Sequence, residues 1–416
     1  MKIGILTFAN VPNFGAALQA LSTVGWLKQH GHEPVIIRWE PDDFRARFKD
    51  MQDLIQPAEH FRFFNEMFPV TTLCSTDKEV AEVIESEKIE AVIIGSDAVL
   101  QAFTWITLTD FPTKTLFRLR EATSERRYPN CFWGSFKKYL HHPIPIALMS
   151  PSAQNVGFKS LSPRVKLRMK RDLQDMVYVS ARDNWTRQMI NHVSFGKVKA
   201  LLTPDPVFAF NHNCEALIPS REEIISKYGL PDKYMLVSFR SVLLDNIEWM
   251  DGLKREAEKY GLSCVALPMP EGVLFKHNFD YEIPIPLSPL DWFGLIKYAS
   301  GYVGENMHPV LVALHNAVPL FCFDNYGIPK FGAIFLDEKS SKIYDILSRF
   351  DLLANRVGSN RRWWSRPTPE EVMKKIVNFD CRKCQNLSKE RHTEYEKMMH
   401  NIIDRFDKQP GNIVKI

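Results

Sequence analysis

The sequence predicts an α/β protein made of two Rossmann-like domains, each with a parallel sheet flanked by helices. In both halves of the chain, short apolar runs bounded by turn residues alternate with segments of helical periodicity, which is typical of consecutive βαβ units. The chain has 416 residues, too many for one ordinary hydrophobic core, so two domains are expected. Hydrophobic residues make up 45% and charged residues 25% of the chain, as in ordinary folded proteins.

The first half opens with a strand, a helix and a second strand, which predict the first βαβ unit. Further apolar runs follow, as expected for strands covered on both faces, and Asp183 precedes a helical pattern as its cap. The expected elements are strands at 2–8, 34–39, 91–94, 144–149 and 177–180, and helices at 16–28 and 184–192. Residues 98–143 have weak periodicity and many aromatic residues, and this pattern fits either an insertion or a mobile flap.

The same alternation restarts after Pro231 and predicts the second domain. Ser288 caps a helix that has Pro289 and Asp291 in its first turn, where each is favoured. The expected elements are strands at 234–239, 263–267, 301–304 and 319–323, and helices at 247–260, 288–298 and 309–316. We divide the chain into residues 1–205, residues 206–370, and a charged, amphipathic helical segment, 371–416, packed on the outside.

Charge and hydropathy limit the partners and the location. A net charge of +4 is too small to call for nucleic acid, but basic residues gather at 114–138 and 159–171. These clusters are either solvated faces or surfaces for an anionic membrane or a phosphate-bearing acceptor. The N-terminus lacks the pattern of a signal peptide, and no apolar run approaches about 20 residues. A cytoplasmic protein is expected, and association with the inner face of the membrane stays open.

The seven cysteines are odd in number and scattered, which favours reduced thiols over a disulfide framework. Cys381 and Cys384 alone have metal-like spacing, and His392 is the one other nearby candidate. A structural zinc site needs four ligands, so no metal is predicted.

In open parallel sheets, ligands bind beyond the carboxyl ends of the strands, so the loops there are candidate sites. The first such loop, residues 10–15, precedes a helix that contains Gln19. Gly15 would let a ligand approach the backbone amides at the helix N-terminus, which favours an anion or a hydroxyl-rich group. The loop has no GxGxxG or Walker pattern, which disfavours a dinucleotide or P-loop site. A turn that needs Asn13 and Gly15 for conformation alone explains the same residues.

Two more loops in the first half carry polar residues at strand ends. In Gly95-Ser96-Asp97, serine and aspartate can orient a sugar hydroxyl and accept its proton, although both are also ordinary capping residues. Arg182, in the segment 180–183, offers a planar fork for a carboxylate or phosphate, and a salt bridge is its alternative role.

The fourth loop runs from Gly304 to Pro309. If Pro309 is the first helical residue, His308 lies at the helix cap and faces the crevice. Histidine titrates near neutral pH, so a proton-transfer role is predicted, with a purely structural histidine as the alternative.

These loops, in this order, resemble those of the polysaccharide pyruvyltransferase family. The family's Asn-aromatic-Gly-Ala pattern with a Leu-Gln-Ala continuation is matched by residues 13–16 and 18–20. Its Gly-Ser-Asp is matched by residues 95–97, its Ser-x-Arg with a following acidic residue by 180–183, and its Asp-Pro by 205–206.

In the second half, the segment from residues 287–289 through 317–319 matches the family's order of elements. The resemblance covers roughly the first 330 residues. One departure stands out. Where the family has Ser-Phe-His-Gly, this chain has Asn306-Met307-His308-Pro309, so the histidine is kept while its neighbours change.

The resemblance implies the fold of the two-domain GT-B glycosyltransferases, with the active site between an acceptor-side N-terminal domain and a donor-side C-terminal domain. It implies phosphoenolpyruvate as donor, and a glycan or lipid-linked oligosaccharide as acceptor, in exopolysaccharide, capsule or cell-wall glycan biosynthesis. The methylene of phosphoenolpyruvate is protonated, one sugar hydroxyl attacks the central carbon, phosphate leaves, and a second hydroxyl closes the ketal.

Such a reaction needs a proton donor, cations for the carboxylate and phosphate, and a base. No metal or other cofactor is expected, because arginine and a helix N-terminus can hold the anion. The catalytic residues expected are His308 and Asp97; the donor-binding residues are Arg182, Arg240, Glu305 and Asn306; the acceptor-binding residues are Asn13, Gly15, Gln19, Gly95 and Ser96.

Two other functions stay open. A glycosyltransferase of the same fold would use a nucleotide sugar and need an acidic residue for the ribose, a role open to Glu305. A catalytically silent homologue would bind glycans or assemble with other enzymes, which the altered neighbours of His308 suggest. The acceptor sugar, the ketal stereochemistry and the oligomeric state, including a homo-oligomer, are not fixed by the sequence.

Overall fold

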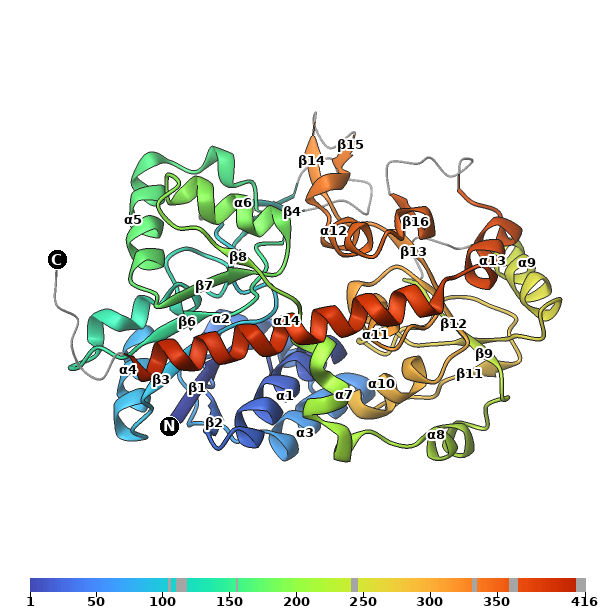
Figure 1. Ribbon diagram of the computed structural model, residues 1–416, viewed down its shortest axis with the longest axis horizontal. Coiled ribbons are helices and arrows are strands. Elements are labelled where there is room, and N and C mark those ends of the chain that lie inside the picture. The colour runs from blue at the N-terminus through green and yellow to red at the C-terminus, as the bar shows by residue number, and fades with distance from the viewer. Residues whose placement is uncertain are drawn as a thin grey trace.

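The computed structural model describes residues 1–103, 106–109, 118–154, 156–240, 246–330, 335–358 and 366–408. Figure 1 shows two α/β halves side by side, crossed on one face by the long helix α14 (Cys381–Asp407). Each half contains one six-stranded sheet.

The first sheet has the order β2-β1-β3-β6-β7-β8, and every neighbouring pair is parallel. Successive side chains of its strands point into different cores: Ile3 and Ile5 belong to one apolar cluster, while Leu6 belongs to another. The strands are β1 (Lys2–Leu6), β2 (Glu33–Ile36), β3 (Ala91–Ile94), β6 (Ile146–Leu148), β7 (Tyr178–Ala181) and β8 (Leu201–Leu202). The helices of this half are α1 (Phe14–Gln29), α2 (Asp42–Phe48), α3 (Ile55–Met67), α4 (Asp77–Ser86), α5 (Pro163–Gln174) and α6 (Asn184–Val193).

The second sheet has the order β11-β10-β9-β12-β13-β16 and is again parallel throughout. Its strands are β9 (Tyr234–Ser238), β10 (Ser263–Ala266), β11 (Tyr281–Glu282), β12 (Gly301–Gly304), β13 (Leu320–Asp324) and β16 (Arg356–Gly358). The helices around it are α8 (Arg221–Tyr228), α9 (Ile247–Glu258), α10 (Pro289–Lys297), α11 (Met307–His315), α12 (Lys342–Arg349) and α13 (Pro369–Val377). The predicted fold class, two parallel sheets flanked by helices, is confirmed.

One helix start was predicted wrongly. Helix α11 begins at Met307 with Asn306 as its N-cap, so His308 lies in the first turn and not at the cap. Pro309 is the third helical residue, because a proline is tolerated anywhere in the first turn, where its missing N–H has no helical partner.

The stretch 98–143 contains short 3₁₀ turns and a small antiparallel hairpin of β4 (Ile106–Thr109) and β5 (Arg118–Glu121). Lys114, the start of the first basic cluster, lies outside the described residues. The second basic cluster lies on α5, which exposes Arg164, Arg168 and Arg171 and buries Met169 and Leu173.

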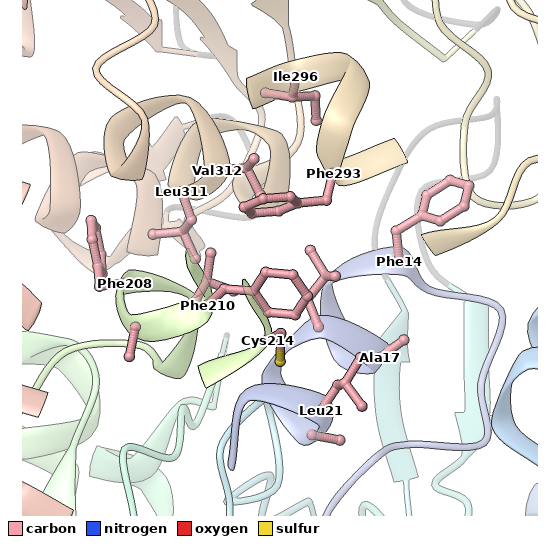
Figure 2. Packing of buried hydrophobic residues seen from close by; sticks show 14 of the residues in the cluster. Phe14, Ala17, Leu21, Phe208, Phe210, Cys214, Phe293, Ile296, Leu311 and Val312 are labelled. Atoms are coloured by element: carbon pink, nitrogen blue, oxygen red, sulfur yellow. The ribbon is translucent and has the colours of Figure 1, made fainter. Parts of the chain in front are cut away.

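A single apolar cluster joins the two halves. Figure 2 shows Phe210 between Leu21 of α1 on one side and Phe293 of α10 and Leu311 of α11 on the other. These residues are almost completely buried. The 3₁₀ turn η5 (Pro206–Ala209) and helix α7 (Phe210–Asn213) lie in this junction and pack against α1. The halves therefore share part of their core.

Helix α14 connects the two halves from outside. Near its start, Cys384 packs against α11, and its Sγ lies 3.5 Å from the carbonyl oxygen of Leu314. Near its end, the guanidinium of Arg405 donates to the carbonyl oxygen of Val177, beside β7. Among the described helices, none is both long and apolar enough to span a membrane.

Candidate functional site

A cavity of about 360 Å³ lies where the carboxyl ends of both sheets meet. Its walls include the loops after β1 and β3 in the first half and after β9 and β12 in the second. In each sheet these are the two strands at which the order reverses, since β2 and β10 lie on the opposite side of β1 and β9. Such switch points are where open α/β sheets bind ligands.

Four cationic side chains line this cavity against two carboxylates, which favours an anionic ligand. The cations are Arg47, Arg126, Arg240 and Lys342, and the carboxylates are Asp97 and Glu271.

Helix α1 points its N-terminus at the cavity. The side chain of Asn13 accepts hydrogen bonds from the backbone N–H groups of Gly15 and Ala16, so it caps the helix. A Cβ atom on Gly15 would lie 1.9 Å from Cγ of His308, which shows that the imidazole is seated directly on the glycine. Gly15 is needed for the close approach of the two halves, a reason that its sequence context did not reveal.

We expect Gly15→Ala to displace the imidazole of His308 and to lower the affinity of the cavity for an anionic ligand at least tenfold while the protein stays folded. The added methyl has no room unless α11 or the ring moves. Calorimetric titration of inorganic phosphate into both proteins measures the effect. The control is Gly31→Ala, at a glycine with open space around it, although its φ of +76° carries a backbone strain of its own. Unchanged affinity in Gly15→Ala would contradict the close packing.

The Gly95-Ser96-Asp97 loop brings one carboxylate to the cavity. Gly95 has φ +118°, and a Cβ there would meet the carbonyl oxygen of Met149 at 2.1 Å, so only glycine fits. The Ser96 hydroxyl donates to the carbonyl oxygen of Ser150 at 2.6 Å. Both residues therefore shape the loop, while Asp97 lines the cavity.

Arg182 lies behind Asp97 and does not line the cavity. The residue is 4% exposed; its Nη1 donates to Oδ2 of Asp205 at 2.7 Å, and its Nη2 lies 3.9 Å from Oδ1 of Asp97. Burial alone would lower the pKa of Arg182, but Asp205, Asp97 and Asp183 raise it above its usual value. Nε and Nη2 of this guanidinium are buried without a hydrogen-bond partner.

Gln19 belongs to this network and not to the cavity wall. Its Nε2 donates to the same oxygen, Oδ2 of Asp205, at 2.5 Å, and the residue is buried. The other carboxylate oxygen of Asp205 accepts from the backbone N–H of Val207 and so caps η5. This carboxylate ties α1, β7 and the junction between the halves together.

His308 lines the cavity with its Nε2 buried and without a hydrogen-bond partner. Burial lowers the pKa of His308 to about 3, with further lowering by Lys342 and Arg182. The free protein therefore holds a neutral imidazole at physiological pH. An anion bound nearby would favour the protonated form, because its negative charge counteracts the positive charges of Lys342 and Arg182.

Lys342, the first residue of α12, is a cavity residue that sequence reasoning missed. Burial, and then the charge of Arg182, lower the pKa of Lys342 to about 8. Its Nζ lies 4.5 Å from the centre of the Tyr326 ring, and no carboxylate of the described residues pairs with it. A half-buried ammonium without an anionic partner is a strong attractor for an anionic ligand.

Glu305 does not line the cavity and supports its wall. One carboxylate oxygen accepts from the backbone N–H of Arg240 at 2.7 Å, and the other accepts from Asn325 at 2.9 Å. Burial raises the pKa of Glu305 to about 7. Because Glu305 lies outside the cavity lining, this carboxylate is poorly placed to grip a ribose.

A model of the polysaccharide pyruvyl transferase family matches residues 13–326. The chain belongs to the polysaccharide pyruvyl transferase family. No curated protein matches the sequence.

Solved structures with a similar fold cover nearly the whole chain. Os79 from O. sativa, in complex with U2F and trichothecene, has a TM-score of 0.53 and 12% identity over 98% of this chain and 99% of its own. UDP-GlcNAc 2-epimerase from Neisseria meningitidis, bound to UDP-GlcNAc, has a TM-score of 0.52 and 9% identity over 98% and 100%. S. aureus MnaA with UDP has a TM-score of 0.51 and 12% identity over 99% of both chains. At these identities the likeness concerns the fold, which is the GT-B arrangement.

In this family member, the predicted site residues fall into two groups. Asn13, Gly15, Asp97, Arg240, Asn306 and His308 meet at the cavity. Gln19, Gly95, Ser96, Arg182 and Glu305 lie outside its lining and hold the lining residues in place.

Cys381 and Cys384, the pair with metal-like spacing, differ in burial and gain no third ligand among the described residues. Cys381 is exposed, whereas Cys384 is buried under α11, and neither belongs to a cluster of three or more potential ligands among the described residues. All seven cysteines are free thiols, as expected from their odd number and spacing.

Proposed function

We propose that this chain transfers the pyruvyl group of phosphoenolpyruvate onto a pair of sugar hydroxyls and forms a cyclic ketal. The observation that carries the proposal is the unpaired ammonium of Lys342 beside the unpaired Nε2 of His308, in a cavity with an excess of cations. Phosphoenolpyruvate is small, carries a carboxylate and a phosphate, and needs cations for both.

The residues at the cavity have complementary roles in this proposal. Lys342 and Arg240 bind the carboxylate and phosphate of the donor, and the N-terminus of α1 adds its dipole. The charge of the bound donor raises the pKa of His308, which then gives a proton to the methylene carbon. The carbon–carbon double bond supplies the electron pair for the new C–H bond, and positive charge develops at the central carbon.

Asp97 serves as the base for the acceptor. Its Oδ1 accepts from the backbone N–H of Ala98 at 2.7 Å and faces Arg182, while Oδ2 has no partner among the described residues. Oδ2 takes the proton of the first hydroxyl as that oxygen bonds to the central carbon. The C–O bond to phosphate then breaks, inorganic phosphate leaves with the bonding electrons, and the second hydroxyl closes the ring with loss of its proton.

Thermal unfolding with and without phosphoenolpyruvate tests the donor. A ligand at about 100 times its dissociation constant adds roughly 2.7 kcal/mol to the stability of the native state. We expect a rise in Tm for the parent that is lost in His308→Ala. His141→Ala, an exposed histidine paired with Glu85 outside the cavity, is the matched control and keeps the rise.

A parent that is not stabilised by phosphoenolpyruvate but is stabilised by a nucleotide sugar would overturn this proposal in favour of glycosyl transfer. Binding of glycans that His308→Ala leaves unchanged, without any effect of either donor, would instead favour a catalytically silent homologue.

A further inference from the structure

A second cluster of polar side chains lies away from the cavity, where α14 crosses α1. His30, Glu396 and His400 each offer one potential ligand atom, and these atoms lie within 4.8 Å of one another. Glu396 and His400 are one turn apart on α14, and His30 follows the last residue of α1. Both histidines are exposed, so an ion can enter from solvent without opening the fold.

The ring of His30 is held by partners that leave one nitrogen free. Nδ1 of His30 lies 2.8 Å from the carbonyl oxygen of Trp26, so it carries the proton and leaves the Nε2 lone pair available. The His30 ring also stacks on the buried indole of Trp26, with 3.8 Å between ring centres and 16° between planes. A histidine that donates from one nitrogen to a carbonyl and offers the other is the usual arrangement of a metal ligand.

The carboxylate of the cluster is oriented in the same way. The Nε1–H of Trp26 donates to Oε2 of Glu396 at 2.9 Å. Nε2 of His392, one turn earlier on α14, lies 3.4 Å from Oε1 of Glu396. Trp26 therefore holds Glu396 beside His30 and His400, and Trp26 is not itself a ligand.

We propose that His30, Glu396 and His400 bind one divalent transition-metal ion, with zinc as the best match, at the crossing of α1 and α14. Two imidazole nitrogens and one carboxylate suit zinc, nickel, cobalt or copper, whereas calcium and magnesium prefer oxygen ligands. Zinc binds such ligands at about 2.0–2.1 Å. Nε2 of His400 now lies 3.9 Å from Oε2 of Glu396, a separation that an ion between them spans with small rotations of the exposed His400 ring. Water completes the fourth position.

This site would fasten the crossing helix. Helix α14 starts against α11 in the second half and ends beside β7 in the first, so a metal bridge to α1 fixes it near its middle. The inference does not depend on the proposed function, because the cluster lies outside the cavity lining.

The test uses the full chain without a histidine tag, stripped with EDTA and dialysed, and titrates it with zinc chloride in a calorimeter. We expect one equivalent to bind and the Tm to rise by a few degrees. His30→Ala and His400→Ala should each weaken zinc binding at least tenfold, and both positions are exposed, so the variants fold. Cobalt(II) in place of zinc should give the visible absorption of a four-coordinate site.

Three controls separate this site from general binding to the surface. His141→Ala removes a histidine that pairs with one carboxylate alone, and Cys381→Ser removes the exposed thiol; both variants should bind zinc as the parent does. Magnesium should give no rise in Tm. Absence of saturable binding at one equivalent overturns the proposal, and so does equal zinc affinity in the parent and the two alanine variants.

Discussion

Replacing Arg182 with methionine is expected to lower the free energy of unfolding by about 3–5 kcal/mol, the cost of removing one partner from a buried ion pair. Asp205 is 2% exposed and would keep only the amide of Gln19 and its backbone donor, while Asp97 would lose the nearest cation. Urea unfolding of both proteins measures the loss. Turnover should fall as well, because Asp97 would no longer be held at the cavity wall.

Two control variants alter the charges of the buried Arg182–Asp205 pair in other ways. Arg182→Lys keeps a cation and should recover part of the stability. Asp205→Asn combined with Arg182→Met removes both members of the pair, and the double variant should lose less than the sum of the two single losses. Strict additivity of the single losses would show that the ion pair contributes nothing to the fold.

Replacing Lys342 with methionine is expected to reduce kcat/KM for phosphoenolpyruvate by about 10²–10³-fold, as for other preorganised groups that stabilise anionic charge. The same change should not destabilise the free protein, because the ammonium is half-buried without a carboxylate partner. Steady-state kinetics and urea unfolding, measured on the same samples, separate the two effects. A loss of stability as large as that of Arg182→Met would contradict this role.

The lowered pKa of Lys342 predicts how kcat/KM and stability change with pH. The pKa of Lys342 in the native state is about 8, below its usual value, so the side chain is charged below pH 8 and neutral above it. kcat/KM reports the free enzyme, so it should fall as the pH rises through about 8. Stability should change in the other direction: the native state gains stability as the pH rises from about 8 toward the unfolded value of 10.5.

Lys342→Arg is the matched variant, since arginine stays charged throughout this range. The pH profile of its kcat/KM should lack the additional fall near pH 8, and so should the profile of Lys342→Met. A fall near pH 8 that persists in both variants would assign the titration to another group.

The sequence allowed the sheets to be predicted but not the partners of each site residue. Apolar runs such as residues 91–94 are buried on both faces, and burial of that kind is visible in composition. The start of α11 was missed because Pro309 was read as the first helical residue, while the extended backbone of Asn306 sets the cap. Proline marks the first turn of a helix and does not mark one position in it.

Lys342 could not have been found from local patterns. It follows Ser341 at the start of an ordinary helix, some thirty positions from His308 in the sequence, and only the return of the chain from β13 brings it to the cavity. Arg182 shows the opposite case. Its position at a strand end predicted a ligand clamp, and the salt bridge that was its alternative role is what the fold contains.

The apolar cluster shared by α1, α7, α10 and α11 has a consequence for how such a chain can evolve. Cutting between residues 205 and 206 would strip Phe14 and Leu21 of their neighbours on one fragment and expose Phe210 and Phe293 on the other. Each fragment would expose an apolar patch that the intact protein buries. We therefore expect the two halves to evolve as one unit. Recombination with a distant relative would have to preserve the residues of this apolar cluster on both halves at the same time. New specificity arises more readily in the loops around the cavity, which can vary without changing that apolar cluster.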